Sequence, residues 1–189
     1  MRRIFLLGVM SGFPWVLIGS SLSLWLKEDG LSRSAVGWAG LIFAVYAVNF
    51  LWAPLVDRLR LPYLTDRLGH RKSWILLMQV LILASLLFWS TLAPSINITL
   101  VIGAGLLIAI CSATQDITID ALRIEQIDKT DTAAMAAGAS VAVIGWWSGF
   151  KIGGLIALMV ADKLQMMGFE TYWQMTFILL GGLVILCNI

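Results

Sequence analysis

Long runs of apolar residues, separated by short polar segments, form the main pattern along this chain. The runs do not alternate between apolar and polar positions, which argues against half-buried strands. Because a membrane-spanning helix needs about 20 largely apolar residues, runs of this length predict transmembrane helices. The sequence contains six such runs: Ile4–Leu26, Val36–Val56, Trp74–Ala93, Ile98–Leu122, Ala133–Val160 and Tyr172–Ile189. The predicted fold is therefore all-α, a polytopic membrane bundle of six helices that forms one domain over residues 1–189.

Composition strengthens this prediction and excludes other classes of protein. Hydrophobic residues make up 60% of the 189 positions, charged residues only 13%, and the mean hydropathy is +0.91. An ordinary soluble domain is about 45–50% apolar and about 25% charged, so a soluble fold of this length could not bury so much apolar surface. The expected partner is the lipid bilayer, because a net charge of +2 is too small to indicate nucleic acid.

The distribution of cations predicts the orientation in the membrane. Nine cationic residues fall on one side of the predicted spans: Arg2, Arg3, Arg58, Arg60, Arg67, Arg71, Lys72, Arg123 and Lys129. Only Lys27, Arg33 and Lys163 fall on the other side. Because loops rich in Lys and Arg stay in the cytoplasm, we expect a cytoplasmic N-terminus. The last predicted span stops at Ile189 without a polar flank, so we expect the sequence to be a fragment or half of a longer polypeptide.

Metal and cofactor chemistry has no support in the sequence. Neither Cys111 nor Cys187 has a second cysteine or histidine at metal-binding spacing. No nucleophile–base pair is evident either. We therefore expect no metal, no cofactor and no enzymatic activity.

The loop between the second and third predicted spans reads LWAPLVDRLRLPYLTDRLGHRKSWILL. It resembles, in split form, the signature loop of the major facilitator superfamily, G-x-x-x-D-R-x-G-R-R/K, with Ala53 at the first Gly position. The residues that match are Asp57 and Arg58, then Asp66, Arg67, Gly69, Arg71 and Lys72. Basic side chains here can hold neighbouring carboxylates, and such pairs can lock one of two conformations. We interpret the loop as a gate; the alternative is a simple positively charged anchor.

Four further segments narrow the resemblance. SGFPWVLIGSSLSLWL, FLWAPLVDRLRLPYL, RKSWILLMQ and CSATQDITIDA occur in this order along the chain. Together they resemble the AmpG-type muropeptide permeases. The resemblance implies a proton-driven importer of anhydromuropeptides, a glycopeptide-like cargo, in the bacterial inner membrane. It also implies a carrier about twice this long, whose C-terminal six-helix half is absent here and whose N-terminal half consists of two inverted three-helix repeats.

Two aspartates interrupt the fourth predicted span. Asp116 and Asp120 are four residues apart, so they share one helix face, which Arg123 continues toward the cytoplasmic boundary. Asp120 can pair with Arg123, whereas Asp116 lies deeper, where an unpaired charge costs at least about 2.5–3.5 kcal/mol. Hydrocarbon favours the protonated carboxyl, so Asp116 is the first candidate for proton coupling and Asp120 the second. The alternative is that Gln115 or Asp116 tethers a neighbouring helix by a hydrogen bond.

The fifth predicted span carries one cation, Lys151, four residues after Trp147. At a rise of 1.5 Å per residue, Lys151 lies about 15 Å from the depth of Asp116, too far for an ion pair. An indole beside an ammonium could hold a sugar ring and a carboxylate, which makes both residues candidates for binding substrate. Alternatively, Lys151 extends to the outer headgroups while Trp147 packs against lipid.

Small and polar residues give the remaining candidates. Ser20 and Gln115 are interpreted as substrate-binding, although a helical serine also bonds its own backbone. Gly145, Gly149 and Gly153 form a stripe that predicts a close helix contact.

Three functions are compatible with these patterns. The leading hypothesis is a secondary transporter that works by alternating access on anhydromuropeptides. A major facilitator carrier for acetyl-CoA, a sugar or a drug is the first alternative, and a membrane assembly factor without transport is the second.

Overall fold

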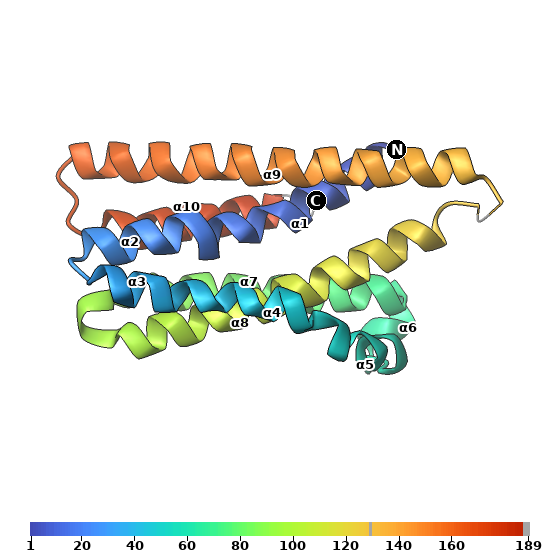
Figure 1. Cartoon of the computed structure of the whole chain (residues 1–189), viewed down its shortest axis with the longest axis horizontal. Helices are drawn as coiled ribbons and strands as arrows, with labels where there is room; N and C mark the ends of the chain where they lie inside the picture. Colours follow the sequence, from blue (N-terminus) through green and yellow to red (C-terminus); the bar gives the residue numbers. More distant parts are fainter. Residues whose placement is uncertain (129, 187–189) are drawn as a thin grey trace.

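The structure, a computed structural model, describes residues 1–128 and 130–186, with the backbone alone at Leu186. Helices that run back and forth along one long axis make up the bundle, and the described ranges contain no strand (Figure 1). The α-helices are α1 (Arg2–Val16), α2 (Leu22–Glu28), α3 (Arg33–Ala39), α4 (Ala44–Val48), α5 (Ala53–Arg58), α6 (Leu64–Leu68), α7 (His70–Trp89), α8 (Pro94–Glu125), α9 (Thr132–Met166) and α10 (Tyr172–Leu186). The prediction of an all-α membrane bundle is confirmed.

Five helical segments are long and apolar enough to cross a membrane. They are Arg2–Glu28, Arg33–Leu51, His70–Trp89, Pro94–Glu125 and Thr132–Met166. The sixth predicted span, Tyr172–Ile189, corresponds to the shorter apolar helix α10, and its residues 187–189 lie outside the described part of the chain. The helices of the fourth and fifth spans begin before and end after the predicted apolar runs, because a helix can continue into the polar boundary.

The first two spans contain irregular turns. A π-helical turn, Leu17–Ser21, joins α1 to α2 without breaking the span. The second span contains 3₁₀ turns at Gly40–Phe43 and Asn49–Leu51, which separate α3, α4 and α5. Such turns change the rotation of the helix, so the side chains before and after them face different neighbours.

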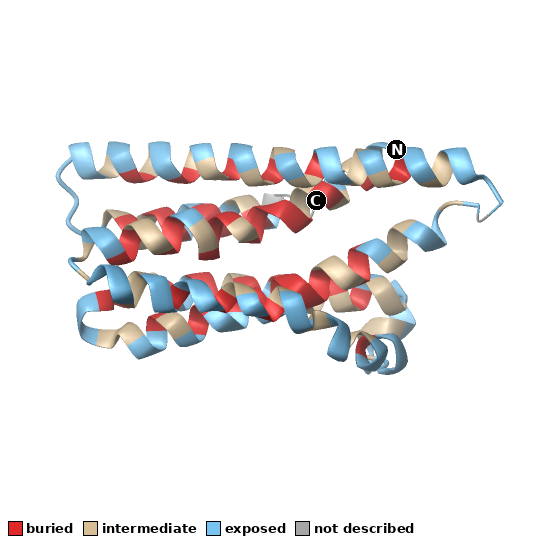
Figure 2. Cartoon of the chain, viewed as in Figure 1, coloured by how far each residue is buried: buried red, intermediate tan, exposed pale blue. Residues whose placement is uncertain are grey.

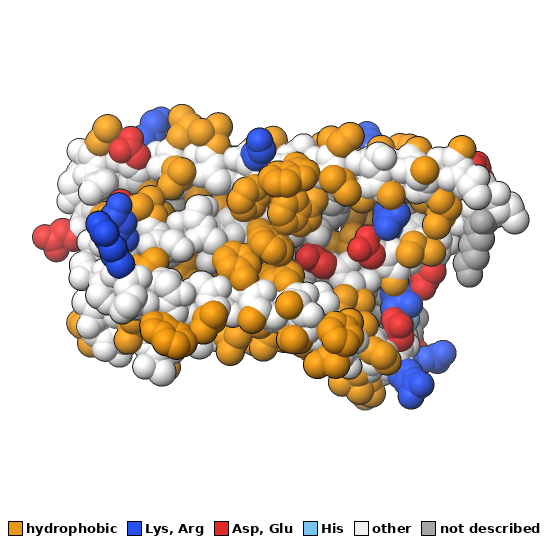
Figure 3. All heavy atoms as spheres, viewed as in Figure 1, with side chains coloured by type: hydrophobic (Ala, Val, Ile, Leu, Met, Phe, Trp, Pro, Cys, Tyr) orange, Lys and Arg blue, Asp and Glu red, His pale blue; other side chains and the backbone are white. Residues whose placement is uncertain are grey.

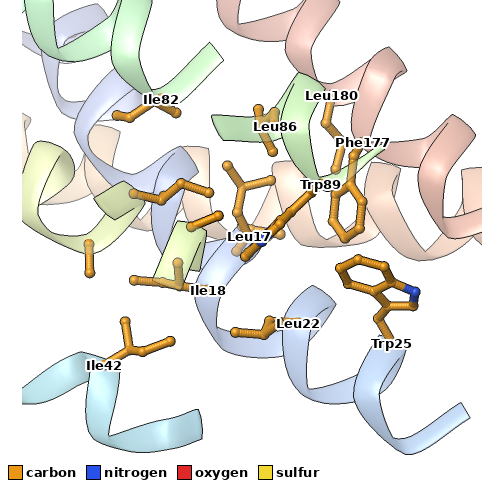
Figure 4. Packing of buried hydrophobic residues seen from close by; sticks show 14 of the residues in the cluster. Leu17, Ile18, Leu22, Trp25, Ile42, Ile82, Leu86, Trp89, Phe177 and Leu180 are labelled. Carbon is orange, nitrogen blue, oxygen red and sulfur yellow. The ribbon is translucent and has the colours of Figure 1, made fainter. Parts of the chain in front are cut away.

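An aromatic and aliphatic core joins α2, α7, α8 and α10. The rings of Trp25, Trp89 and Phe177 meet edge-on or tilted, with centroids 4.9–5.9 Å apart (Figure 4). Trp89 Nε1 donates a hydrogen bond to the Val101 carbonyl at 2.9 Å, so the buried indole is satisfied. This packing joins four helical segments in one core.

Helix α9 packs along α1 through glycines (Figure 1). A Cβ atom added at Gly145 or Gly149 would collide with the carbonyl oxygens of Phe5 and Val9, and one at Gly12 with that of Trp146. The close helix contact predicted from the glycine stripe is therefore confirmed. The opposite face of α9 is largely exposed in this chain (Figure 2).

The two ends of the bundle differ in charge, and most charged side chains on the face in view lie near the ends (Figure 3). We call the end with the N-terminus, α5, α6 and the connection after α8 the basic end. Its cations are Arg2, Arg3, Arg58, Arg60, Arg67, Arg71, Lys72 and Arg123, and the predicted ninth, Lys129, lies outside the described residues. The turns after α2, α7 and α9 form the opposite end (Figure 1).

Candidate functional site

A cavity between α1, α8 and α9 contains the carboxyl group of Asp116. Its volume is about 240 Å³, and its lining residues are Gly8, Ser11, Asp116, Ile119, Asp120, Ala142, Val143 and Trp146. Ser11 Oγ donates a hydrogen bond of 2.5 Å to Asp116 Oδ1. Gly8 lets α1 and α9 approach closely at this level, since a Cβ atom added there would collide with the Ala142 carbonyl oxygen. The carboxylate thus meets a hydroxyl donor and open space instead of hydrocarbon.

Aromatic and polar side chains extend this site between α1 and the second span. The ring of Trp15 lies 4.4 Å from that of Tyr46 and 5.4 Å from that of Trp146, centroid to centroid. Trp15 Nε1, Tyr46 Oη and Ser112 Oγ are buried and have no hydrogen bond of normal geometry within the described residues. Buried polar atoms usually have a partner. Trp15 instead makes a looser contact with the Asp116 carboxyl, and Ser112 makes one with Tyr46, so polar side chains surround Asp116.

Asp120 lies one turn further along α8 and lines the same cavity, but it is exposed. Its Oδ1 accepts hydrogen bonds from Arg123 at 3.1 Å and 3.3 Å, the pairing that the spacing predicted. Asp116 forms no ion pair with any of the described residues. The structure thus separates the two aspartates: one has a hydroxyl partner inside the bundle and the other an ion pair near its basic end.

Lys151 and Trp147 lie on the exposed face of α9. The Lys151 ammonium is 5.9 Å from the centroid of the Trp147 ring, and within the described ranges it forms no ion pair. Trp147 is 50% exposed, and its ring meets Trp146 edge-on at 5.2 Å. Because Trp146 lines the Asp116 cavity, an aromatic surface connects that cavity to the Lys151 ammonium.

The two other predicted substrate residues lie elsewhere. Gln115 is 1% exposed, and its Nε2 donates to the Met10 carbonyl at 3.4 Å. This hydrogen bond tethers α8 to α1, as the alternative interpretation of Gln115 predicted. Gln115 also lines a separate small cavity together with Gln79 and Pro14. Ser20 is exposed, donates to the Val16 carbonyl at 3.3 Å and lines a cavity near the opposite end. The structure therefore does not bring Gln115 or Ser20 to Asp116.

The predicted gate loop contains one ion-pair hub, Arg71. Its guanidinium bonds Asp57 at the end of α5, and its Nε donates to Glu125 Oε1 at 3.0 Å. Three spans are thus joined at the basic end by a side chain that is only 17% exposed. Gly69 has φ +85°, which allows the sharp turn into α7. The other loop residues, Arg58, Asp66, Arg67 and Lys72, are exposed and show no ion pair within the described ranges.

Sequence reasoning missed several of these groups. Glu125 could have been found as the first acidic residue after the fourth predicted span. The participation of Ser11, Trp15 and Tyr46 depends on which spans are neighbours, and no local signal contains that information. Among the described residues, no cluster of three or more potential metal ligands occurs.

We expect the Arg71 hub to contribute modestly to stability. Arg71→Gln and Glu125→Gln, made singly and together, form a double-mutant cycle. We expect a coupling energy of about 0.5–1 kcal/mol, because Glu125 is half exposed and exposed ion pairs are weak. Thermal unfolding in detergent measures it. Arg67→Gln, an exposed cation in the same loop, is the matched control. A coupling energy near zero would show that the ion pair between Arg71 and Glu125 does not contribute to stability.

The architecture is that of a polytopic membrane protein with cavities along its helices. The sequence matches the model of the Major Facilitator Superfamily over residues 4–189. The chain belongs to the Major Facilitator Superfamily, as the loop before α7 had indicated.

Three relatives show where in the family the chain lies. It is 36% identical to the AmpG 4 protein of Rickettsia felis, over 95% of this chain and 41% of that protein. It is 32% identical to the anhydromuropeptide permease of Escherichia coli K12, over 97% of this chain and 35% of the permease. Identity to the AmpG 1 protein of Rickettsia bellii is 32% over 82% of this chain and 36% of the relative.

These comparisons confirm the resemblance to AmpG-type permeases of the superfamily. The chain spans about two fifths of the length of the relatives it matches. No solved structure matches it.

Proposed function

We propose that residues 1–189 form the N-terminal six-helix half of a proton-coupled importer of anhydromuropeptides in the bacterial cytoplasmic membrane. The carrier would work by alternating access together with a C-terminal half, and the basic end would face the cytoplasm. The family membership and the name of the Escherichia coli relative support the cargo. The excess of cations at one end supports the orientation.

The observation that carries the proposal is the Asp116 carboxyl in its cavity. Among the described residues this carboxyl has the Ser11 hydroxyl as a partner and no ion pair, so it can gain and lose a proton as the cavity opens to one side and then the other. In this proposal Asp116 carries the coupling proton. Asp120, paired with Arg123, has the smaller role.

We assign cargo contact to the surface between Asp116 and Lys151. Trp146 and Trp147 offer aromatic faces to sugar rings, and Lys151 offers an ammonium to a carboxylate. Muropeptides contain both groups. Arg71, with Asp57 and Glu125, would hold three spans together at the cytoplasmic gate as the halves rock.

Uptake of labelled anhydromuropeptide by vesicles that contain the complete gene product tests this proposal. We expect accumulation that a protonophore abolishes, and competition by unlabelled anhydromuropeptide but not by acetyl-CoA or a simple sugar. Empty vesicles are the control. Uptake that persists after the proton gradient collapses would contradict the coupling. Flux of another cargo instead would contradict the muropeptide assignment, and no flux of any cargo would favour an assembly factor.

A further inference from the structure

A second cavity lies near the opposite end of the bundle, between α2 and α3, and we call it the outer basic cavity. Its volume is about 590 Å³. It is lined by Ser20, Ser23, Leu24, Lys27, Leu31, Arg33 and Val36. Two cations and two hydroxyls thus face one space with apolar walls. Basic side chains gather at this end of the visible face, over α2 and α3 (Figure 3).

The acidic residues beside this cavity are engaged elsewhere. Glu28 follows Lys27 directly, but its Oε2 accepts hydrogen bonds from Tyr172 at 2.8 Å and from Trp173 at 2.6 Å. Asp29 accepts the backbone N–H of Ser95 at 2.5 Å. Both carboxylates therefore serve α8 and α10, and no ion pair is formed by Lys27 or Arg33 within the described ranges. The charged side chains that line the cavity are therefore both cations without an ion pair, although the Glu28 and Asp29 carboxylates lie close by.

The backbone around the cavity is shaped by local turns. Ser20 belongs to the π-helical turn Leu17–Ser21, a feature that often occurs at functional sites. Ser32 caps α3 by accepting the Ala35 N–H at 3.2 Å, which fixes the start of the helix that carries Arg33. The hydroxyls and cations therefore come from helical segments and not from a long loop.

An aromatic path leads from this cavity toward Asp116. Phe43 packs against Gly19, next to Ser20, and its ring lies 4.9 Å from that of Trp15. The Trp15 ring in turn contacts Trp146, which lines the Asp116 cavity. The two cavities thus lie at the two ends of one aromatic wall.

We propose that the outer basic cavity is an anion-binding site that receives a carboxylate of the cargo before the cargo reaches the Asp116 cavity. Two cations that line one space and form no ion pair within the described ranges attract an anion, and a guanidinium binds a carboxylate with two parallel hydrogen bonds. Ser20 and Ser23 would add hydroxyl donors. The identity of the cargo rests on the proposed function, whereas the anion preference of the cavity does not.

Charged thiol reagents measure this preference without any cargo. In the complete protein in zwitterionic-lipid nanodiscs, Ser23→Cys places a thiol in the cavity, and the protein with native Ser23 gives the background of Cys111 and Cys187. We expect the anionic reagent MTSES to react faster than the cationic reagent MTSET. Lys27→Gln together with Arg33→Gln should lower the ratio of the two rates by at least about fivefold, and more so at low salt. The neutral reagent methyl methanethiosulfonate corrects for changes of access.

Lys163→Gln is the matched control, because Lys163 is an exposed cation near the same end of the bundle that does not line the cavity. An unchanged ratio in the Lys27/Arg33 variant, or an equal change in Lys163→Gln, would overturn the proposal. The same rates are also measured in nanodiscs that contain anionic lipid. An anion preference that is present in zwitterionic lipid but lost in anionic lipid would also overturn the proposal, since the cavity would then be a site for lipid headgroups.

A protection arm separates the site from its cargo. Anhydromuropeptide should slow the reaction of the Ser23→Cys protein with MTSES, and its carboxamide derivative should not. Equal protection by anhydromuropeptide and by its carboxamide derivative would show that the cavity does not bind the carboxylate, and would overturn the proposal. Retained anion preference without any protection would overturn the delivery of this cargo through the cavity, whereas failure of uptake alone bears on the proposed function.

Discussion

Asp116→Asn is expected to reduce the accumulation of cargo to a ratio of roughly one between the two sides of the membrane. An amide cannot exchange a proton, and an uncoupled carrier can only equilibrate its cargo. Counterflow, in which labelled cargo exchanges against unlabelled cargo without a gradient, should continue, because asparagine imitates the protonated carboxyl in shape and in hydrogen bonding. Accumulation and counterflow in the same vesicles measure the effect.

The partners of Asp116 make this prediction specific. Ser11→Ala removes the hydroxyl that donates to Asp116 Oδ1, and we expect weaker coupling but not its loss, since the carboxyl remains. Asp120→Asn is the matched control: it removes a carboxyl from the same helix face and cavity, four residues away, that is exposed and paired with Arg123. Coupling lost in Asp120→Asn and kept in Asp116→Asn would reverse the assignment of the two residues.

Gly12→Ala is expected to lower the free energy of unfolding by about 1–3 kcal/mol, the cost of overpacking. The new Cβ would collide with the Trp146 carbonyl oxygen, and a backbone atom in a packed helix cannot move aside as a side chain can. Gly149→Ala should act in the same way against the Val9 carbonyl. The midpoint of thermal unfolding in detergent should fall by roughly 2–4 °C for each kcal/mol.

Gly103→Ala is the control for this stability series. Gly103 lies inside α8, and a Cβ added there would have no atom within 4 Å. Since alanine is favoured over glycine in a helix by about 0.5–1 kcal/mol, this variant should be neutral or slightly more stable. Equal destabilisation by Gly12→Ala and Gly103→Ala would show that an effect common to both positions, and not the contact between α1 and α9, controls the stability.

The features that depend on local pattern were predictable. Continuous apolar runs indicated the spans, because the hydrocarbon interior requires apolar side chains over a fixed length of helix. The pairing of Asp120 with Arg123 follows from a spacing of three residues within one helix. The glycine stripe on α9 likewise indicated a close contact from one face, although it did not identify α1 as the neighbour.

The features that depend on neighbouring helices were not predictable in the same way. Gln115 and Asp116 are adjacent in sequence, yet they face different cavities, because consecutive helical residues point in directions about 100° apart. Ser11 meets Asp116 across 105 positions of sequence. Arg71 pairs with Asp57 and Glu125, whereas Asp66, in the second part of the split signature, forms no ion pair within the described ranges.

The sequence by itself therefore determined that this protein is a helical membrane bundle, where its spans lie and which residues break their apolar pattern. The tertiary structure decided which of those residues share a cavity. Hydropathy and helical period act within one segment and fix which face of a helix is polar. The order and rotation of the packed helices, set by glycine contacts and irregular turns, determine what that face meets.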